Sequence, residues 1–189
     1  MIVNPKINIR WPVRHDLESL VDIYNQAVRS GISTGHTREF TKAGRWDWYR
    51  NHDKTSFPIY VMAYEKTIIG YGSLSPYREG RKAMSKIAEV SFFLDERFQG
   101  KGYGSLLLAK IISDCDRVGI NTLLAILLDV NKKSIGLLKK FGFKEWGHFP
   151  NVIEFENKIC GQSILGLKVS DADRQLLVEY CDATRSGVS

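Results

Sequence analysis

Residues 90–104 read VSFFLDERFQGKGYG, an apolar run that leads into a glycine-rich turn and then into an amphipathic segment. Gly100, Gly102 and Gly104 carry no side chain, so the backbone around them is uncovered. Consecutive N–H groups in such a turn can point into one concavity beside a helix N-terminus, where the helix dipole favours anions. The stretch therefore predicts a strand, a phosphate-binding turn and a helix in direct succession.

Two better-known glycine patterns do not describe this turn. A P-loop has a Lys-Ser/Thr pair after its last glycine, whereas Tyr103 and Gly104 follow here. The dinucleotide-binding fingerprint has the spacing Gly-x-Gly-x-x-Gly, whereas the spacing here is Gly-x-Gly-x-Gly. An ordinary strand-to-helix turn also needs glycines, so the turn alone leaves a structural role and a phosphate-binding role open.

The composition is that of an ordinary soluble globular protein, with 43% hydrophobic and 25% charged residues. A length of 189 residues allows one domain with a sizeable core and at most a terminal appendage. We expect one domain over residues 1–170, followed by a helix and a disordered tail over 171–189. No apolar run approaches the ~20 residues that cross a bilayer, and the N-terminus lacks the build of a signal peptide. We therefore expect a cytoplasmic protein without a membrane partner.

Cysteine, histidine and charge give no sign of a metal or a nucleic-acid partner. The three cysteines and four histidines are scattered without ligand spacing, so we expect reduced thiols and no metal. The net charge of +6 could attract nucleic acid, but the basic residues are spread along the chain rather than gathered into one run. We expect no nucleic-acid partner, because a polyanionic small ligand accounts for the same charge.

Hydrophobic periodicity predicts an α/β (α+β) fold in which strands and helices follow one another along the whole chain. The expected strands are residues 7–13, 58–64, 68–76, 87–94, 122–128, 143–149 and 159–169, and the expected helices are 17–30, 45–51, 103–118, 131–141 and one from Ser170 onward. Residues 87–94 are apolar after Glu89, which is typical of a strand buried on both faces. Residues 151–158 are expected to form a polar connection.

Helix caps are expected at four short polar side chains. Asp16 and Asn131 stand before their helices, and Ser170 with Asp173 resembles a capping box before the last one. Residues 184–189 are expected to be disordered.

The turn gains a specific meaning from a resemblance to a known family. Gln99-Gly-Lys-Gly-Tyr-Gly104 resembles the Gln/Arg-x-x-Gly-x-Gly/Ala loop with which the GCN5-related N-acetyltransferases (GNAT) bind acetyl-coenzyme A (acetyl-CoA). About thirty residues later, NKKSIGLLKKFGF at 131–143 resembles the second motif of that family, and the order of the predicted elements matches. The resemblance implies a GNAT fold, with a mixed central sheet of about seven strands flanked by helices, here followed by an extra C-terminal helix.

Within that family the chain most resembles the phosphinothricin and amino-acid N-acetyltransferases. The similar residues are Ile23-Tyr24-Asn25, Glu39 with Trp46 seven positions later, and Ala88-Glu89-Val90. The resemblance implies a homodimer that transfers acetyl directly from acetyl-CoA, as cosubstrate, to the primary amine of a small amino-acid-like acceptor. A peptide- or protein-acetylating enzyme of the same fold and a noncatalytic coenzyme A sensor stay open.

The same resemblance assigns roles to particular side chains. Glu89 is the first candidate for the general base, directly or through water, and Glu39 is the second or a binder of the ammonium group. Leu138 stands where many family members carry a Tyr acid, so no Tyr acid is expected there. For Asn131 a simple helix cap is an alternative that can hold at the same time. The expected contacts of acetyl-CoA are Phe92, Phe93, Leu94, Gln99, Gly100, Lys101, Gly102, Tyr103, Gly104, Asn131 and Ser134.

Overall fold

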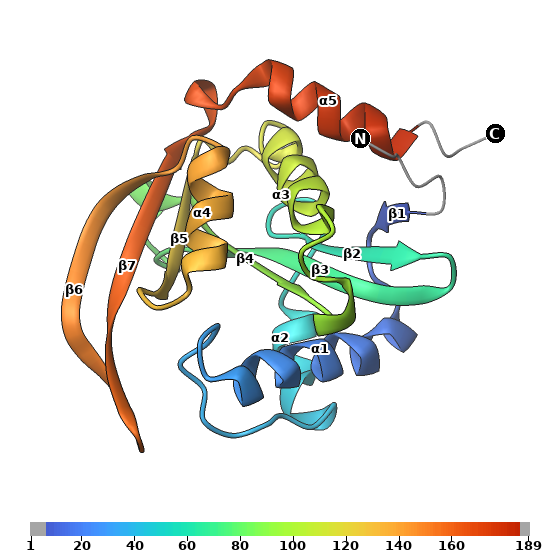
Figure 1. The fold of residues 1–189 in the computed structure, drawn as a ribbon. Helices are drawn as coiled ribbons and strands as arrows, with labels where there is room; N and C mark the ends of the chain where they lie inside the picture. The colour runs from blue at the N-terminus through green and yellow to red at the C-terminus, as the bar shows by residue number, and fades with distance from the viewer. Residues whose placement is uncertain (1–6, 186–189) are drawn as a thin grey trace.

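The structure, a computed structural model, describes residues 7–185 and centres on one seven-stranded mixed sheet (Figure 1). The strands are β1 (Ile7–Arg10), β2 (Ile59–Tyr64), β3 (Thr67–Pro76), β4 (Ile87–Leu94), β5 (Thr122–Leu128), β6 (Lys144–Phe155) and β7 (Lys158–Lys168). The α-helices are α1 (Leu17–Ser30), α2 (Trp46–Arg50), α3 (Tyr103–Asp114), α4 (Lys132–Lys140) and α5 (Arg174–Arg185). The spatial order is β1-β2-β3-β4-β5-β7-β6, and this confirms the predicted fold class.

Helices cover the sheet on both sides, with α3 and α5 on one side and α1 and α2 on the other (Figure 1). The apolar stripe of α3 is fully buried in the larger core cluster. Leu177 and Tyr180 of α5 are buried in that same cluster, so the C-terminal helix is part of the core. Leu20 and Ile23 of α1 belong to a second cluster on the opposite side.

The sheet opens in its middle, and this opening positions the site. The neighbours β4 and β5 are parallel and pair only over Ile87–Glu89 and Thr122–Leu124. Beyond that point β4 continues to pair with β3, and β5 continues to pair with β7. The two central strands therefore diverge, and one edge of β4 is left facing a gap.

The predicted polar connection over residues 151–158 is wrong. β6 continues to Phe155 and β7 begins at Lys158, so only two residues form the turn of a long hairpin. The register shifts between Phe149 and Ile153, and Asn151 has a φ of 55°. An irregular pairing of this kind lets a strand carry polar residues that alternation does not anticipate. At the hairpin tip the Lys158 ammonium donates to the carbonyl of Gly31, at the end of α1.

Several predicted ends and caps also differ from the structure. Asp16 does not cap α1, because its carboxylate accepts hydrogen bonds from the Arg10 guanidinium at 2.6 and 2.9 Å and from the Val13 N–H at 2.8 Å. Asp173 alone accepts the first-turn N–H of α5, that of Leu176, at 3.0 Å, whereas the Ser170 hydroxyl lies 3.0 Å from Asp171 Oδ1. The prediction of a capping box is therefore half right.

Three element lengths change as well. β1 ends at Arg10 and α3 ends at Asp114, each a few residues short of the predicted end. α5 runs through Arg185, past the predicted start of disorder at residue 184, and residues 186–189 lie outside the described range. β4 is not buried on both faces: Ala88 and Val90 are buried, but the side chains on its other face are partly exposed because they line cavities.

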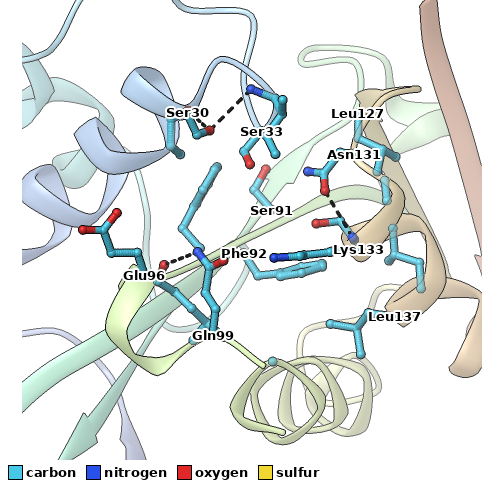
Figure 2. A pocket seen from close by; sticks show the side chains of 18 of the residues that line it. Ser30, Ser33, Ser91, Phe92, Glu96, Gln99, Leu127, Asn131, Lys133 and Leu137 are labelled. Carbon is cyan, nitrogen blue, oxygen red and sulfur yellow. Dashed lines mark hydrogen bonds between the residues drawn. The ribbon is translucent and has the colours of Figure 1, made fainter. Parts of the chain in front are cut away.

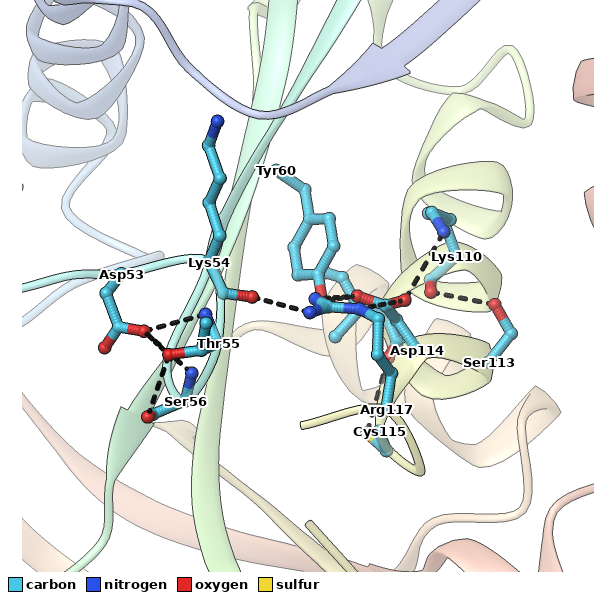
Figure 3. A network of polar contacts seen from close by, with 11 residues as sticks. Asp53, Lys54, Thr55, Ser56, Tyr60, Lys110, Ser113, Asp114, Cys115 and Arg117 are labelled. Atoms are coloured by element: carbon cyan, nitrogen blue, oxygen red, sulfur yellow. Dashed lines mark hydrogen bonds and ion pairs between the residues drawn. The ribbon is translucent and has the colours of Figure 1, made fainter. Parts of the chain in front are cut away.

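A buried polar network ties the end of α3 to β2 (Figure 3). Tyr60 is 1% exposed, and its hydroxyl donates to Asp114 Oδ2 at 2.6 Å. Arg117 donates to both oxygens of Asp114, at 3.0 and 2.6 Å, and to the Lys54 carbonyl at 2.6 Å. Burial and the hydrogen bond to Asp114 both raise the pKa of Tyr60, which keeps this hydroxyl neutral and a donor.

Candidate active site

The glycine turn has the geometry that its spacing predicts. Gly100 and Gly102 have φ values of 74° and 87°, in the left-handed region that favours glycine. Gly102 is the residue that precedes α3, so the first N–H groups of this helix lie at the turn. Gly104 is needed for another reason, since a Cβ there would lie 3.0 Å from a methyl group of Leu137 on α4.

A cavity of about 640 Å³ extends from this turn between the diverging strands to α4 (Figure 2). Of the eleven residues predicted to contact acetyl-CoA, the lining includes Phe92, Phe93, Leu94, Gln99, Gly100, Gly102, Gly104, Asn131 and Ser134. Lys101 and Tyr103 lie outside the lining: the Lys101 ammonium is 5.3 Å from the ring centre of Phe98, and the Tyr103 ring packs on the same ring. We call this cavity the groove.

One edge of β4 presents its backbone to the groove. The Tyr77 N–H bonds the carbonyl of Ile87 and the Asp95 N–H bonds the carbonyl of Ile69, so odd-numbered β4 residues pair with β3. Backbone groups alternate sides along an antiparallel strand. The N–H and C=O groups of Phe92 and its even-numbered neighbours therefore point toward the gap, where an extended ligand can pair with them as an extra strand does.

The far end of the groove is formed by α4. Asn131 is 7% exposed, and its Oδ1 accepts the Ser134 N–H at 3.2 Å, so it is the helix cap. It also lines the groove, so both roles considered for it are compatible with this position. Lys133 reaches into the same space in Figure 2 and is a cation that the sequence analysis missed. Its neighbour Lys132 is also basic but does not line the groove. The two lysines differ only in the direction of their side chains, which the sequence does not reveal.

A second cavity of about 390 Å³ lies on the α1 and α2 side of the sheet. Ser91 and Phe93 line both this cavity and the groove, together with Ser33, Ile126 and Leu127. The two spaces therefore meet at β4. We call this second cavity the acceptor cavity, since a ligand in it would lie beside a ligand in the groove.

Glu89 is the carboxylate of the acceptor cavity. It lies on the same face of β4 as Ser91, directly opposite Ser75 of β3. Burial raises the pKa of the Glu89 carboxyl above its usual value. A carboxylate that holds its proton more tightly is a stronger base once ionised.

Glu39, the second candidate, lies elsewhere. Its carboxylate forms an ion pair with Arg29 at 2.8 Å, both side chains are half exposed, and Glu39 lines neither cavity. The loop before it does contribute to the acceptor cavity: the Tyr24 hydroxyl lies 2.9 Å from Thr34 Oγ1 and 2.6 Å from His36 Nδ1.

Other chemistries find little support among the described residues. Cys115 is fully buried, and burial raises the pKa of its thiol to about 12, so it is a core residue rather than a nucleophile. Among the side chains in the described range, no three His, Cys, Asp or Glu stand together as metal ligands would. None of the described helices is long and apolar enough to span a membrane.

Comparisons with known proteins agree on one family. The model of the acetyltransferase (GNAT) family matches residues 17–143. YwnH of Bacillus subtilis, provisionally named a phosphinothricin acetyltransferase, is 36% identical over 165 residues, which are 87% of this chain and 100% of YwnH. An L-methionine sulfoximine/L-methionine sulfone acetyltransferase of Salmonella typhimurium is 27% identical over 146 residues, 77% of this chain and 85% of the relative.

A solved structure supports the fold. The crystal structure of a GNAT superfamily phosphinothricin acetyltransferase from Sinorhizobium meliloti, in complex with acetyl-CoA, matches with a TM-score of 0.81 at 23% identity. The match covers 86% of this chain and 88% of that one.

Proposed function

This chain belongs to the acetyltransferase (GNAT) family, and on that premise we propose that it moves the acetyl group of acetyl-CoA directly to the primary amine of a small amino-acid-like acceptor. Phosphinothricin and methionine sulfoximine are the first acceptors to consider, given what the relatives are named for. The observation that carries the proposal is the meeting of the groove and the acceptor cavity at β4, with Glu89 beside that junction. A volume of about 390 Å³ suits a small molecule.

The groove fits acetyl-CoA in shape and in chemistry. The N–H groups around Gly100 and Gly102 are available to the pyrophosphate at the start of α3, where the helix dipole favours negative charge. The Lys133 ammonium adds positive charge along the groove. The free edge of β4 offers alternating donors and acceptors to the amides of the pantetheine arm.

Glu89 acts as the general base in this proposal. An acceptor amine arrives mainly as ammonium and must lose a proton before it attacks the thioester. The α-ammonium of a free amino acid has a higher pKa than that of a peptide terminus, which is near ~7.7, so it needs a stronger base, and the raised pKa of Glu89 brings the two values closer. The proton passes to the carboxylate directly or through one water.

Negative charge develops on the acetyl oxygen during attack. A backbone N–H on the free edge of β4 donates a hydrogen bond to this oxygen, as in an oxyanion hole. The coenzyme then leaves as a thiolate, whose pKa is near ~8.5 by analogy with cysteine. Leu138 lines the groove where a Tyr acid is common in the family, and its side chain offers no proton. The thiolate therefore departs without an acid at this position, and the second proton that the attacking nitrogen loses as the amide forms passes to this thiolate or to water.

Gly102→Val is expected to weaken acetyl-CoA binding about tenfold or more. A valine at a φ of 87° costs roughly 1–2 kcal/mol of backbone strain and disturbs the N–H groups at the turn. The matched control is Gly119→Val, at a φ of 73° just beyond the far end of α3, and neither glycine has an atom within 4 Å of an added Cβ. Calorimetric titration with acetyl-CoA should show a weaker dissociation constant for Gly102→Val alone. Equal dissociation constants for the two variants would contradict a role of the turn in binding.

Initial-velocity kinetics test direct transfer. Double-reciprocal plots for acetyl-CoA at several acceptor concentrations should intersect, because both ligands must be bound before acetyl moves. Parallel lines would indicate an acetylated enzyme and would refute the ternary complex. Coenzyme A binding without turnover would favour a sensor, and turnover on peptides alone would favour a protein acetyltransferase.

A further inference from the structure

Arg45 is held in the wall of the acceptor cavity by three aromatic rings. The centre of its guanidinium lies 4.5 Å from the ring centre of Tyr24, 5.1 Å from that of Phe40 and 4.2 Å from that of Trp48. Rings attract a guanidinium through its flat faces, and the five N–H donors lie along its edges. The rings therefore fix the position of Arg45 and leave donors for another partner.

No carboxylate in the described part of the chain forms an ion pair with Arg45. Among the described residues that line the acceptor cavity, it is the sole Lys or Arg. Arg45 is half-buried, and a guanidinium that is partly shielded from water attracts anions more strongly than a fully exposed one. The acceptor cavity thus holds a cation that makes no ion pair with Glu89, the one carboxylate among the described residues that line it.

A second observation concerns Tyr71, on β3, which lines the same cavity. Tyr71 is 1% exposed, and no described residue forms a hydrogen bond of normal length with its hydroxyl, although the Arg45 guanidinium lies close enough to act on it. Burial raises the pKa of this hydroxyl, and the nearby charge of Arg45 only partly opposes that shift, so the group stays a neutral donor. Buried hydroxyls normally have a partner, so a ligand atom is the natural one here.

We infer that Arg45 and Tyr71 together bind the carboxylate of the acceptor, an inference that rests on the proposed function. Tyr71 pairs with Phe93 and Ser75 pairs with Glu89, so Tyr71 and Glu89 lie on one face of the sheet, four residues apart along β3. At ~3.3 Å per residue this is roughly 13 Å between backbones. Their side chains share one cavity, in which a small amino acid has its carboxylate at Arg45 and its amine on the side of Glu89.

The consequence is selectivity for amines that carry a carboxylate. A carboxylate gains charge-assisted hydrogen bonds from the guanidinium and a further one from the Tyr71 hydroxyl. A carboxamide of the same shape loses the charge, and its NH₂ group cannot accept from either donor. Polyamines would place a second cation near Arg45 and are disfavoured more strongly.

L-methionine sulfoximine and its carboxamide provide the test, because the carboxylate is the one anionic group of the free acid near neutral pH. The measured quantity is kcat/KM for each compound with wild type, Arg45→Gln and Tyr71→Phe. Arg45→Gln should lose roughly 10- to 100-fold on the acid and little on the amide. Tyr71→Phe should lose roughly 2- to 10-fold on the acid alone. Comparing variants for each compound cancels the different amine pKa values of the two compounds.

Arg14→Gln is the matched control, since the Arg14 guanidinium also lies over a ring, 5.0 Å from the centre of Trp46, but lines neither cavity. This control should keep the wild-type preference for the acid.

If Arg45→Gln lowers kcat/KM equally for the acid and the amide, Arg45 has only a structural role and the inference is overturned. If Arg45→Gln does not fold, Tyr71→Phe decides by the same comparison. Wild type that acetylates neither compound refutes the proposed acceptor class instead, and wild type that acetylates both equally well refutes only the carboxylate site.

Discussion

Glu89→Gln is expected to lower kcat at least ~100-fold with any acceptor that the wild type acetylates. The substitution keeps the size and shape of the side chain, so both cavities keep their walls, but an amide cannot accept a proton from the ammonium. The loss should shrink as the pH rises, because a growing share of the acceptor then arrives as the free amine. Steady-state rates of thiol release between pH 6 and 9 measure both effects.

Glu39→Gln is the control for this prediction. Glu39 pairs with Arg29 at the surface and lines neither cavity, so the variant should stay within about twofold of wild type. A large loss in Glu39→Gln with normal activity in Glu89→Gln would exchange the two assignments. Normal activity in both variants would leave the reaction without a carboxylate base.

Glu89→Gln should also be more stable than wild type at neutral pH. Burial raises the folded-state pKa of Glu89 above its usual value of about 4.5, so the folded state prefers the protonated carboxyl. This contribution to stability is complete below pH ~4.5 and is lost as the pH rises through the folded-state pKa. Urea unfolding at several pH values should therefore give equal unfolding free energies for Glu89→Gln and wild type in acid. Near neutral pH the unfolding free energy of the variant should be the larger one. A variant less stable than wild type at pH 7 would contradict the assigned direction of the pKa shift.

Asp114→Ala is expected to cost about 3 kcal/mol of unfolding free energy, which for a chain of this size lowers the melting temperature by roughly 6–12 °C. The change removes the acceptor of the buried Tyr60 hydroxyl and the main partner of Arg117. The Tyr60 hydroxyl stays buried, so its desolvation is no longer offset, whereas the 39% exposed Arg117 side chain loses mainly its ion pair. Thermal unfolding followed by circular dichroism measures the shift.

The matched control is Asp116→Ala, two residues further on. Asp116 is exposed and its one described ion pair, with Arg174, is long at 3.8 Å, so the change should stay within about 0.5 kcal/mol. Burial opposes ionisation of Asp114, but Arg117 and Tyr60 outweigh it and the pKa is lowered. Its stabilisation is therefore present above pH ~3.8 and lost below it. Equal melting temperatures for the two variants would show that the network is not stabilising.

The parts of the site that follow from adjacent residues could be predicted from sequence. The alternating glycines near Gly102 require a turn next to a helix, and their φ values confirm this. Asn131 caps α4 as expected, because nothing nearby competes for its side chain. Asp16 does not cap α1, because its carboxylate forms an ion pair with Arg10 of β1 instead. Local sequence shows that a cap is available but not which partner is closer in space.

The acceptor cavity could not be predicted in this way. Arg45 lies in the short 3-10 turn just before α2 and Tyr71 lies in β3, and nothing in either segment shows that packing brings them together. Glu89 was identified only through the family resemblance, since a charged residue inside an apolar run has no intrinsic mark of a base. Arg45 resembles any surface arginine in the sequence until the three rings around it are seen.

The most direct test of the account is a mass-spectrometric search for acetylated product. Purified protein is incubated with acetyl-CoA and, in separate reactions, L-phosphinothricin, L-methionine sulfoximine, a polyamine and a short peptide, while thiol release is followed. We predict that the N-acetyl form of at least one of the two amino acids accumulates in step with thiol release, and that the polyamine and peptide react much more slowly. Acetyl-CoA binding with no acetylated amino acid, or faster acetylation of the peptide, would contradict it.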